Sequence, residues 1–445
     1  MLNFQAKGKI QFLQYQAASL LVYRSLLQTE VGLNWKATLA ALLDSGGKAI
    51  APVEAYAQWF LALTKQNQGW QDYIINQIFQ ADNPFSRQAQ GQEFASLPTH
   101  LVKAARHDLQ VLQQIYVYSG ADLCNWVQSL SPMTIDLVSW DRDLTTQTPL
   151  FPRKRQQHQL ELKQKLQTDT NWADWLPEIA TYYYQFGCGD LATYDAWRWQ
   201  AGNLVGIPYP DPIKLKDLMG YELPKAQLIK NTEALLQGYP SLHTLLYGSR
   251  GSGKSSLIKA LLDEYSDRGL RLVEVAKSDL IHLPEITEKL RLLPQKFIIF
   301  VDDLSFEDDD DSYKALKVVL EGNLSSRPAN VVIYATSNRR HLIREFFADR
   351  PRPQDANEIH AWDTVQEKLS FSDRFGLSLT FEPANQDTYL TIIYHLAHQA
   401  GISLPPTELQ HQALQWAVQH NGRSGRTARQ FVDYLRFSER TNLST

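Results

Sequence analysis

The order of apolar and polar positions divides the chain into two parts. Up to about residue 205, apolar residues recur at the three- and four-residue spacing of amphipathic helices, most clearly in residues 51–65 and 101–117. From about residue 241, short runs of consecutive apolar residues alternate with helical patterns. Buried strands that alternate with helices are typical of a parallel sheet covered by helices on both faces. The pattern therefore predicts an all-helical part followed by an α/β part.

Five strands are expected in the α/β part, of which residues 297–301 (FIIFV) are the clearest. The other four are residues 242–247, 271–276, 331–335 and 377–381. Helices are expected at residues 224–237, 256–265, 311–320 and 343–347. After Glu382 the periodicity is helical again, at residues 387–400, 406–420 and 426–437. These three helices predict a small helical lid behind the sheet.

A proline-rich stretch separates the two parts. Residues 206–212 contain three prolines behind a glycine, a composition that breaks helices and strands and favours an extended connector. The predicted organisation is a helical N-terminal domain at 1–205, a linker at 206–214, an α/β core at 215–382 and a helical lid at 383–445.

Composition narrows the class of protein without naming a function. The net charge of −4 gives no general attraction to nucleic acid or membranes, and no apolar run has membrane-spanning length. Cys124 and Cys188 lack a metal-ligand spacing and are expected to be reduced thiols in a cytoplasmic protein. The many tryptophans of the helical part are interpreted as core residues, with a surface that stacks bases or peptides as the alternative.

Residues 248–255 (GSRGSGKS) match the phosphate-binding pattern G-x-x-x-x-G-K-[ST], between an expected strand and an expected helix. Glycines let several backbone N–H groups turn toward one anion, and the following helix adds the positive end of its dipole. In this pattern the lysine, Lys254, reaches the outer phosphates and the Ser255 hydroxyl is a ligand of Mg²⁺. The predicted nucleotide-binding residues are Gly248, Ser249, Arg250, Gly251, Ser252, Gly253, Lys254, Ser255 and Ser256.

Polar residues follow two of the expected strands. Asp302 and Asp303 come directly after residues 297–301, at the end of the strand where open α/β sheets bind ligands. Asp302 is the expected second Mg²⁺ ligand. Asp303, or Glu307 after a turn, is expected to position the attacking water, and Asn338 is expected to orient water beside this acidic pair.

Two arginines complete the predicted site. Arg374 precedes the last expected strand and is interpreted as a residue that stabilises the transition state on a neighbouring subunit's nucleotide. The alternative is a surface ion pair. Arg426 begins the last helix, where positive charge opposes the helix dipole unless an anion lies nearby.

These segments resemble the AAA+ ATPase module over about residues 215–437. GSRGSGKS is similar to Walker A, FIIFVDD to Walker B and YATSN to sensor 1 with Asn338. SDRFG is similar to the arginine-finger segment with Arg374, and SGR to sensor 2 with Arg426. More narrowly, the chain resembles the AAA+ family known as domain of unknown function 815. In place of the water-activating glutamate of most AAA+ proteins, this chain has Asp303.

The resemblance also implies an architecture. Residues 215–238 are similar to the stretch that lines the adenine pocket. The fourth strand of such modules lies between the first and the third, which implies that Asn338 lies between the phosphates and Asp302.

Two charged segments are particular to this chain. Residues 307–311 are an acidic run, interpreted as a solvated loop rather than a metal site. Residues 344–353, with Arg339 and Arg340, form a basic region that suits either a nucleic-acid backbone or an acidic partner loop.

The expected function is Mg²⁺-dependent ATP hydrolysis by a homo-oligomer that assembles with ATP and remodels or loads a protein or nucleic-acid partner, with no membrane partner. Two alternatives remain, a nucleotide-gated scaffold with slow hydrolysis and a DNA-associated loader. A GTPase is not expected, because residues 336–340 read TSNRR and no N-K-x-D segment occurs.

Overall fold

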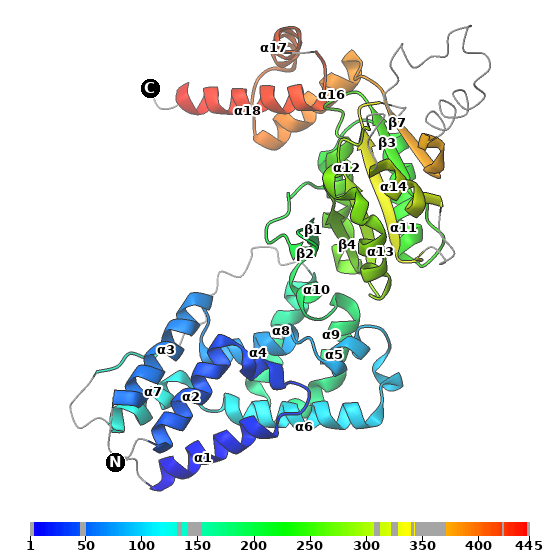
Figure 1. Ribbon diagram of the computed structural model, residues 1–445. Coiled ribbons are helices and arrows are strands. Elements are labelled where there is room, and N and C mark those ends of the chain that lie inside the picture. Colours follow the sequence, from blue (N-terminus) through cyan, green and yellow to red (C-terminus); the bar gives the residue numbers. More distant parts are fainter. Residues whose placement is uncertain are drawn as a thin grey trace. The chain divides into compact units, whose positions relative to one another are not determined.

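The protein divides into two compact units, Met1–Thr193 and Tyr194–Thr445 (Figure 1). The computed structural model describes residues 4–44, 50–130, 136–140, 154–306, 312–321, 328–339, 342, 371–420 and 422–442. No described helix combines the length and the apolar character needed to cross a membrane.

The first unit is helical, as predicted. Its α-helices are α1 (Phe4–Ser19), α2 (Glu30–Asp44), α3 (Ile50–Gln66), α4 (Trp70–Phe79), α5 (Pro84–Ala89), α6 (Thr99–Tyr116), α7 (Gly120–Leu130), α8 (Lys154–Thr168), α9 (Leu176–Phe186) and α10 (Asp190–Thr193). Trp59, Trp70 and Trp172 are at most 1% exposed, and Trp70 stacks on Trp35. Burial of these large rings confirms the interpretation of the tryptophans as core residues.

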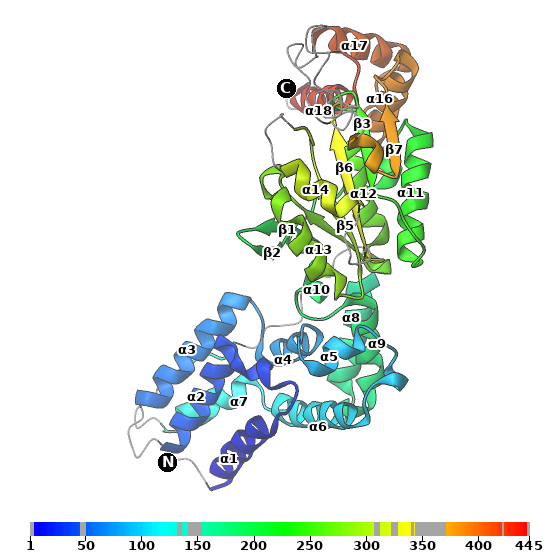
Figure 2. The same ribbon diagram turned by 45° about the vertical axis from the view of Figure 1, so that its right-hand side comes forward.

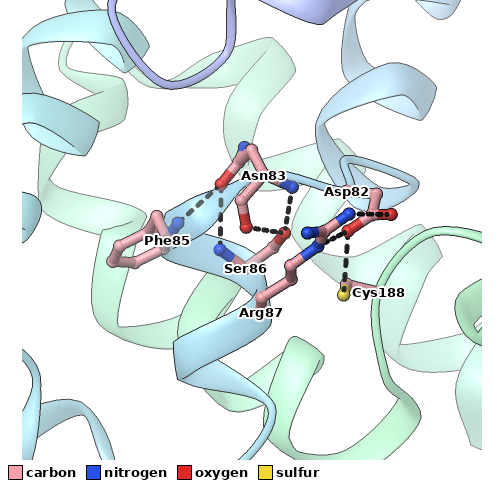
Figure 3. Close-up of polar contacts among 6 residues, drawn as sticks. All are labelled: Asp82, Asn83, Phe85, Ser86, Arg87 and Cys188. Atoms are coloured by element: carbon pink, nitrogen blue, oxygen red, sulfur yellow. Dashed lines mark hydrogen bonds and ion pairs between the residues drawn. The ribbon is translucent and has the colours of Figure 1, made fainter. Parts of the chain in front are cut away.

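Helix α5 begins with a capping box, which satisfies backbone groups at its first turn (Figure 3). The Asn83 side chain accepts hydrogen bonds from the backbone N–H groups of Phe85 and Ser86, and the Ser86 hydroxyl accepts one from Asn83 N–H. The neighbouring Arg87 guanidinium donates to both carboxylate oxygens of Asp82. Burial raises the pKa of the Cys188 thiol beside Asp82 to about 11, which keeps it protonated and agrees with the prediction of an unreactive thiol.

The second unit is built on a seven-stranded sheet with the order β2-β1-β4-β5-β6-β3-β7. The strands are β1 (Ala196–Gln200), β2 (Asn203–Gly206), β3 (Thr244–Gly248), β4 (Leu270–Glu274), β5 (Lys296–Val301), β6 (Val331–Ser337) and β7 (Leu377–Phe381). All neighbours pair in parallel except β1 and β2. The five predicted strands are β3 to β7, each within one or two residues of its expected bounds, and β6 lies between β3 and β5 as expected.

The sheet has two strands more than predicted, because residues 194–206 do not belong to a helical domain. They form a hairpin whose strand β1 pairs in parallel with β4. Trp197 and Trp199 are buried, whereas Arg198 between them is exposed, which is the two-residue period of a strand. The turn residues Ala201 and Gly202 both have positive φ, as tight two-residue hairpins require. The predicted boundary at residue 205 is therefore wrong, and the second unit begins with this hairpin.

The backbone of the predicted linker is irregular, but the segment packs against the second unit. Ile207 and Ile213 pack against the core of the second unit, and Lys259 on α12 pairs with Asp211 at 3.6 Å. Tyr209 in the same stretch is 93% exposed. The segment therefore lies on the α/β core with one projecting residue.

Helices cover both faces of the sheet (Figures 1 and 2). Helices α11 (Glu222–Leu236) and α12 (Lys254–Tyr265) share one apolar core with the strands, and α13 (Leu283–Arg291) and α14 (Ser312–Glu321) pack against each other on the other face. Helix α13 was not predicted, and the helix expected at 343–347 lies outside the described residues. The lid helices α16 (Gln386–Ala400), α17 (Pro406–Gln419) and α18 (Gly425–Asn442) form their own core, as expected.

A fragment that begins at the predicted boundary is expected to be much less stable than one that begins at Tyr194. Starting at residue 207 removes two buried tryptophans, each worth about 3–5 kcal/mol, and leaves β4 as an unpaired edge. We expect fragment 194–445 to unfold cooperatively in urea and fragment 207–445 to unfold at a much lower urea concentration or to aggregate. Equal midpoints would contradict the assignment of the hairpin. In the whole chain, limited proteolysis should cut early near Tyr209, which is 93% exposed, and resistance at this position would contradict a projecting residue there.

Candidate nucleotide-binding site

The loop between β3 and α12 has the conformation that the phosphate-binding pattern predicts. Gly248, Gly251 and Gly253 have φ values of 136°, 74° and 90°, which side chains disfavour. A Cβ atom on Gly248 would also lie 2.0 Å from the carbonyl oxygen of Phe381, where β7 ends beside β3. Glycine is therefore required at Gly248 by both backbone angle and space.

Lys254 begins α12 and turns back over the loop. Its Nζ donates hydrogen bonds to the carbonyl oxygens of Gly248 (3.0 Å) and Ser249 (2.7 Å), and the residue is 7% exposed. Burial lowers the pKa of this ammonium group, while the nearby carboxylates of Asp303 and Asp302 act in the opposite direction. A buried cation at a helix N-terminus is a strong attraction for an anion.

Three oxygen atoms meet at the end of β5. The Ser255 hydroxyl lies 2.6 Å from Asp302 Oδ1, and the Thr336 hydroxyl donates to the same oxygen at 2.5 Å. Ser255 comes from the first turn of α12 and Thr336 from β6, so two elements of the fold converge on one carboxylate. Serine and aspartate oxygens of this kind suit Mg²⁺, which prefers hard oxygen ligands. The residues present therefore fit the Mg²⁺ site predicted at Ser255 and Asp302.

Asp303 has a strained backbone and a fixed side chain. Its φ of 50° lies in the left-handed region, which aspartate tolerates better than most residues. The Asn338 amide donates to Asp303 Oδ1 at 2.6 Å. The structure thus brings Asn338 to Asp303, and Thr336, two residues earlier, contacts Asp302. Asn338 lies one residue beyond the end of β6 and lines the cavity.

The lid reaches the loop through the start of α18. The backbone N–H of Arg426 donates to the carbonyl oxygen of Gly251 at 3.3 Å, and a Cβ atom on Gly251 would lie 3.2 Å from the Cβ of Arg426. Arg426 and Arg429 both line the cavity above the loop. The arginine-rich start of the last helix therefore lies at the cavity above the phosphate loop.

A cavity of about 1120 Å³ joins these groups. One wall is apolar or aromatic and comes from the segment before α11 and from the lid, through Leu218, Met219, Tyr221, Ile392 and Leu396. The predicted site residues that line the cavity are Arg250, Gly251, Ser252, Gly253, Lys254, Ser255, Ser256, Asp302, Asp303, Asn338 and Arg426. Gly248 and Ser249 contribute their carbonyl oxygens to Lys254 instead. A phosphate-binding end and an apolar end are what a nucleotide requires.

Of the remaining two predicted residues, only Arg374 lies in the part of the chain that the structure describes, and it does not line this cavity. Glu307 lies outside the described residues. Arg374 ends a short 3-10 helix (Phe371–Arg374) before β7, and its guanidinium forms an ion pair with Glu321 at the end of α14. Strand β7 runs parallel to β3, and the phosphate loop follows the carboxyl end of β3. The start of β7 therefore lies at the opposite end of the strands from the loop. Arg374 therefore does not reach the cavity of its own chain.

Sequence reasoning missed several residues that line the cavity. Thr336 is the second-last residue of β6, and the sequence pattern did not indicate that its hydroxyl contacts Asp302. Asp211, Pro212 and Ile213 line the cavity from the stretch that was predicted to be only a linker. No sequence pattern distinguishes a proline-rich connector that packs on a cavity from one that does not.

Comparisons with known proteins give one family and several distant relatives. The model of the family described as protein of unknown function (DUF815) matches residues 192–439. The large subunit of replication factor C from Staphylothermus marinus is 42% identical over 69 residues, which are 15% of this chain and 16% of that subunit.

Among solved structures, the RuvB Holliday junction branch migration motor of Thermotoga maritima matches at 16% identity with a TM-score of 0.34. The match covers 51% of this chain and 64% of the motor. A mutant form of the same motor matches at 16% identity with a TM-score of 0.36, over 51% of this chain and 65% of that one.

Proposed function

The chain belongs to the family of proteins of unknown function called DUF815, and we propose that it is an AAA+ P-loop protein that binds ATP and hydrolyses it with Mg²⁺. The observation that carries the proposal is the convergence of Ser255 and Asp302 beside Lys254 at the mouth of the phosphate loop. A hydroxyl, a carboxylate and a buried ammonium group from one loop and one strand end are the parts that phosphoryl transfer requires.

Each group at the loop has a role that follows from its position. The backbone N–H groups of the loop and Lys254 hold the phosphates, because they supply positive charge from one side. Ser255 and Asp302 would hold Mg²⁺, which neutralises charge that develops on the phosphate oxygens when it is bound. Arg426 approaches the same space from the lid, where its charge adds to that of Lys254.

Asp303 accepts the water proton in this proposal. A general base must lie within about 3 Å of its water, and Asn338 holds one oxygen of the Asp303 carboxylate by a 2.6 Å hydrogen bond. The other carboxylate oxygen has no such contact among the described residues. Glu307 remains the alternative base.

The nucleotide base is adenine in this proposal. The apolar wall of Leu218, Met219 and Ile392 offers a flat ring contact with few polar atoms. Tyr221 belongs to the same wall, and the centroid of its ring lies 5.1 Å from that of Phe381. Its hydroxyl donates a hydrogen bond to the carbonyl oxygen of Glu382 at 2.7 Å. Since Glu382 joins β7 to the lid, occupancy of the cavity is coupled to lid position.

In this proposal, a homo-oligomer that assembles with ATP uses ATP hydrolysis to remodel or load a macromolecular partner. Arg374 supports the oligomer, because it lies away from its own cavity, as a residue that acts on a neighbour's nucleotide would. A nucleotide-gated scaffold with slow hydrolysis is the second candidate, and the short Asp303 side chain in the place of a glutamate favours it. The DNA-loader hypothesis depends on residues 344–353, which lie outside the described residues, so it stays a prediction.

Lys254→Ala is expected to reduce ATP affinity at least 100-fold while leaving the fold intact, because the fixed charge for the outer phosphates is lost. Lys230→Ala is the matched control, since Lys230 is exposed on α11 and does not line the cavity. Calorimetric titration with ATP and Mg²⁺ measures the affinities. Wild-type affinity in Lys254→Ala would show that this loop is not the nucleotide site.

For the wild type, ATP turnover with and without DNA or unfolded protein, together with mass by light scattering, distinguishes the proposed partners.

A further inference from the structure

One hydroxyl group links the two acidic residues of the site. Thr336 Oγ1 donates to Asp302 Oδ1 at 2.5 Å and accepts a hydrogen bond from the backbone N–H of Asp303 at 3.0 Å. Thr336 is 2% exposed on β6, in the middle of the sheet. The hydroxyl therefore uses both its donor and an acceptor position on the two neighbouring acidic residues.

Each of the two contacts constrains a different residue. The donated bond sets the direction of the Asp302 carboxylate, whose Oδ1 also meets the Ser255 hydroxyl. The accepted bond holds the peptide N–H of Asp303, whose φ of 50° is unfavourable without such support. That backbone angle in turn directs the Asp303 side chain toward Asn338.

We propose that Thr336 is a positioning residue that orients Asp302 toward Mg²⁺ and Asp303 toward the attacking water through a single hydroxyl. The inference rests on the proposed function and extends it to a residue that contacts the two acidic residues through its hydroxyl. Groups behind a metal ligand typically change metal affinity 10–100-fold when they are removed, because they orient the ligand.

The adjacent serine provides a matched control. Ser337 is also buried on β6, but its hydroxyl donates to the carbonyl oxygen of Leu304 at 2.8 Å and accepts from Arg339 N–H at 3.1 Å. It therefore supports the same turn after β5 without contact to either acidic side chain. A purely structural role of Thr336 predicts that loss of either hydroxyl has the same consequences.

The experiment measures ATP binding as a function of Mg²⁺ concentration by calorimetry, for wild type, Thr336→Val, Thr336→Ser and Ser337→Ala. We expect Thr336→Val to raise the half-saturating Mg²⁺ concentration about 10–100-fold, and Thr336→Ser, which keeps the hydroxyl, to match the wild type. Ser337→Ala should leave the Mg²⁺ dependence unchanged. ATP binding in EDTA should be the same in all four proteins, since the loop and Lys254 are intact, and this measurement shows that each variant is folded.

At saturating Mg²⁺, turnover by Thr336→Val should stay below that of the wild type, because Asp303 has also lost its support. If Thr336→Val does not bind ATP in EDTA, Thr336→Ala provides the same measurement without a branched apolar side chain. An unchanged Mg²⁺ dependence in the folded variant, or an equal change in Ser337→Ala, would overturn the proposal. A wild-type protein whose ATP binding does not respond to Mg²⁺ would instead remove the proposed function itself.

Discussion

Replacing Arg374 with alanine is expected to slow ATP hydrolysis by about 10³-fold and to leave ATP affinity unchanged. The residue does not line the cavity of its own chain, so it contributes nothing to binding there. Its guanidinium pairs with Glu321 through Nε, whereas Nη1 has no hydrogen-bond partner among the described residues. This donor is buried in the single chain, so contact with a phosphate on a neighbouring copy requires the guanidinium to turn outward.

The control for this prediction is Glu321→Gln. If Arg374 acts only through the ion pair with Glu321, both variants should lose the same activity. If Arg374 acts on a neighbour, Glu321→Gln should keep most of the turnover. Mixing Arg374→Ala with Lys254→Ala should then restore part of the activity, because a mixed interface combines an intact loop with an intact arginine. Absence of rescue, with a monomeric mass in the presence of ATP, would exclude the oligomeric mechanism.

Replacing Asp303 with asparagine is expected to slow hydrolysis by about 10²–10⁴-fold and to leave ATP bound. Asparagine adopts the left-handed backbone region as readily as aspartate, so the φ of 50° is retained and only the proton acceptor is lost. Single-turnover hydrolysis of bound ATP, with retention measured by gel filtration, tests this directly.

Two further variants separate the candidate bases. If Asp303 is the base, Asp303→Glu gains reach toward the water but is less suited to the left-handed backbone, which costs roughly 1–2 kcal/mol. Its turnover should therefore stay near or above the wild-type value, with lower stability. If Glu307 is the base, Glu307→Gln should trap bound ATP instead of Asp303→Asn. Asp303→Glu should then leave turnover unchanged or lower it. Fast turnover in both Asp303→Asn and Glu307→Gln would point to a base elsewhere in the chain.

The sequence predicted the parts of the fold that local pattern determines. Continuous apolar runs such as residues 297–301 have no alternative to a buried strand, and the glycine spacing of residues 248–253 allows few backbone paths. The sequence predicted positions near the loop for Asp302, Asn338 and Arg426, because motif spacing and strand order together limit where these residues can lie.

The parts that were missed depend on long-range packing. The alternation in residues 196–200 is short, and only contact with β4 makes it a strand of this sheet. The pairing of Arg374 with Glu321 joins segments that no periodicity relates. The sequence does not show on which face of the sheet the Thr336 side chain lies. Its hydroxyl faces Asp302 and not the opposite side of the sheet.

The strand order also determines when this protein can acquire a nucleotide site during its synthesis. Strand β3 and the phosphate loop leave the ribosome before their sheet neighbours β6 and β7, which are residues 331–337 and 377–381. Such distant pairings form late, after the first unit has had time to fold. Gly248 packs on the carbonyl oxygen of Phe381, so the loop lacks its final support until the end of β7 is made. A nascent chain that stops before residue 377 would therefore contain the whole phosphate-binding sequence and still have no site for a nucleotide.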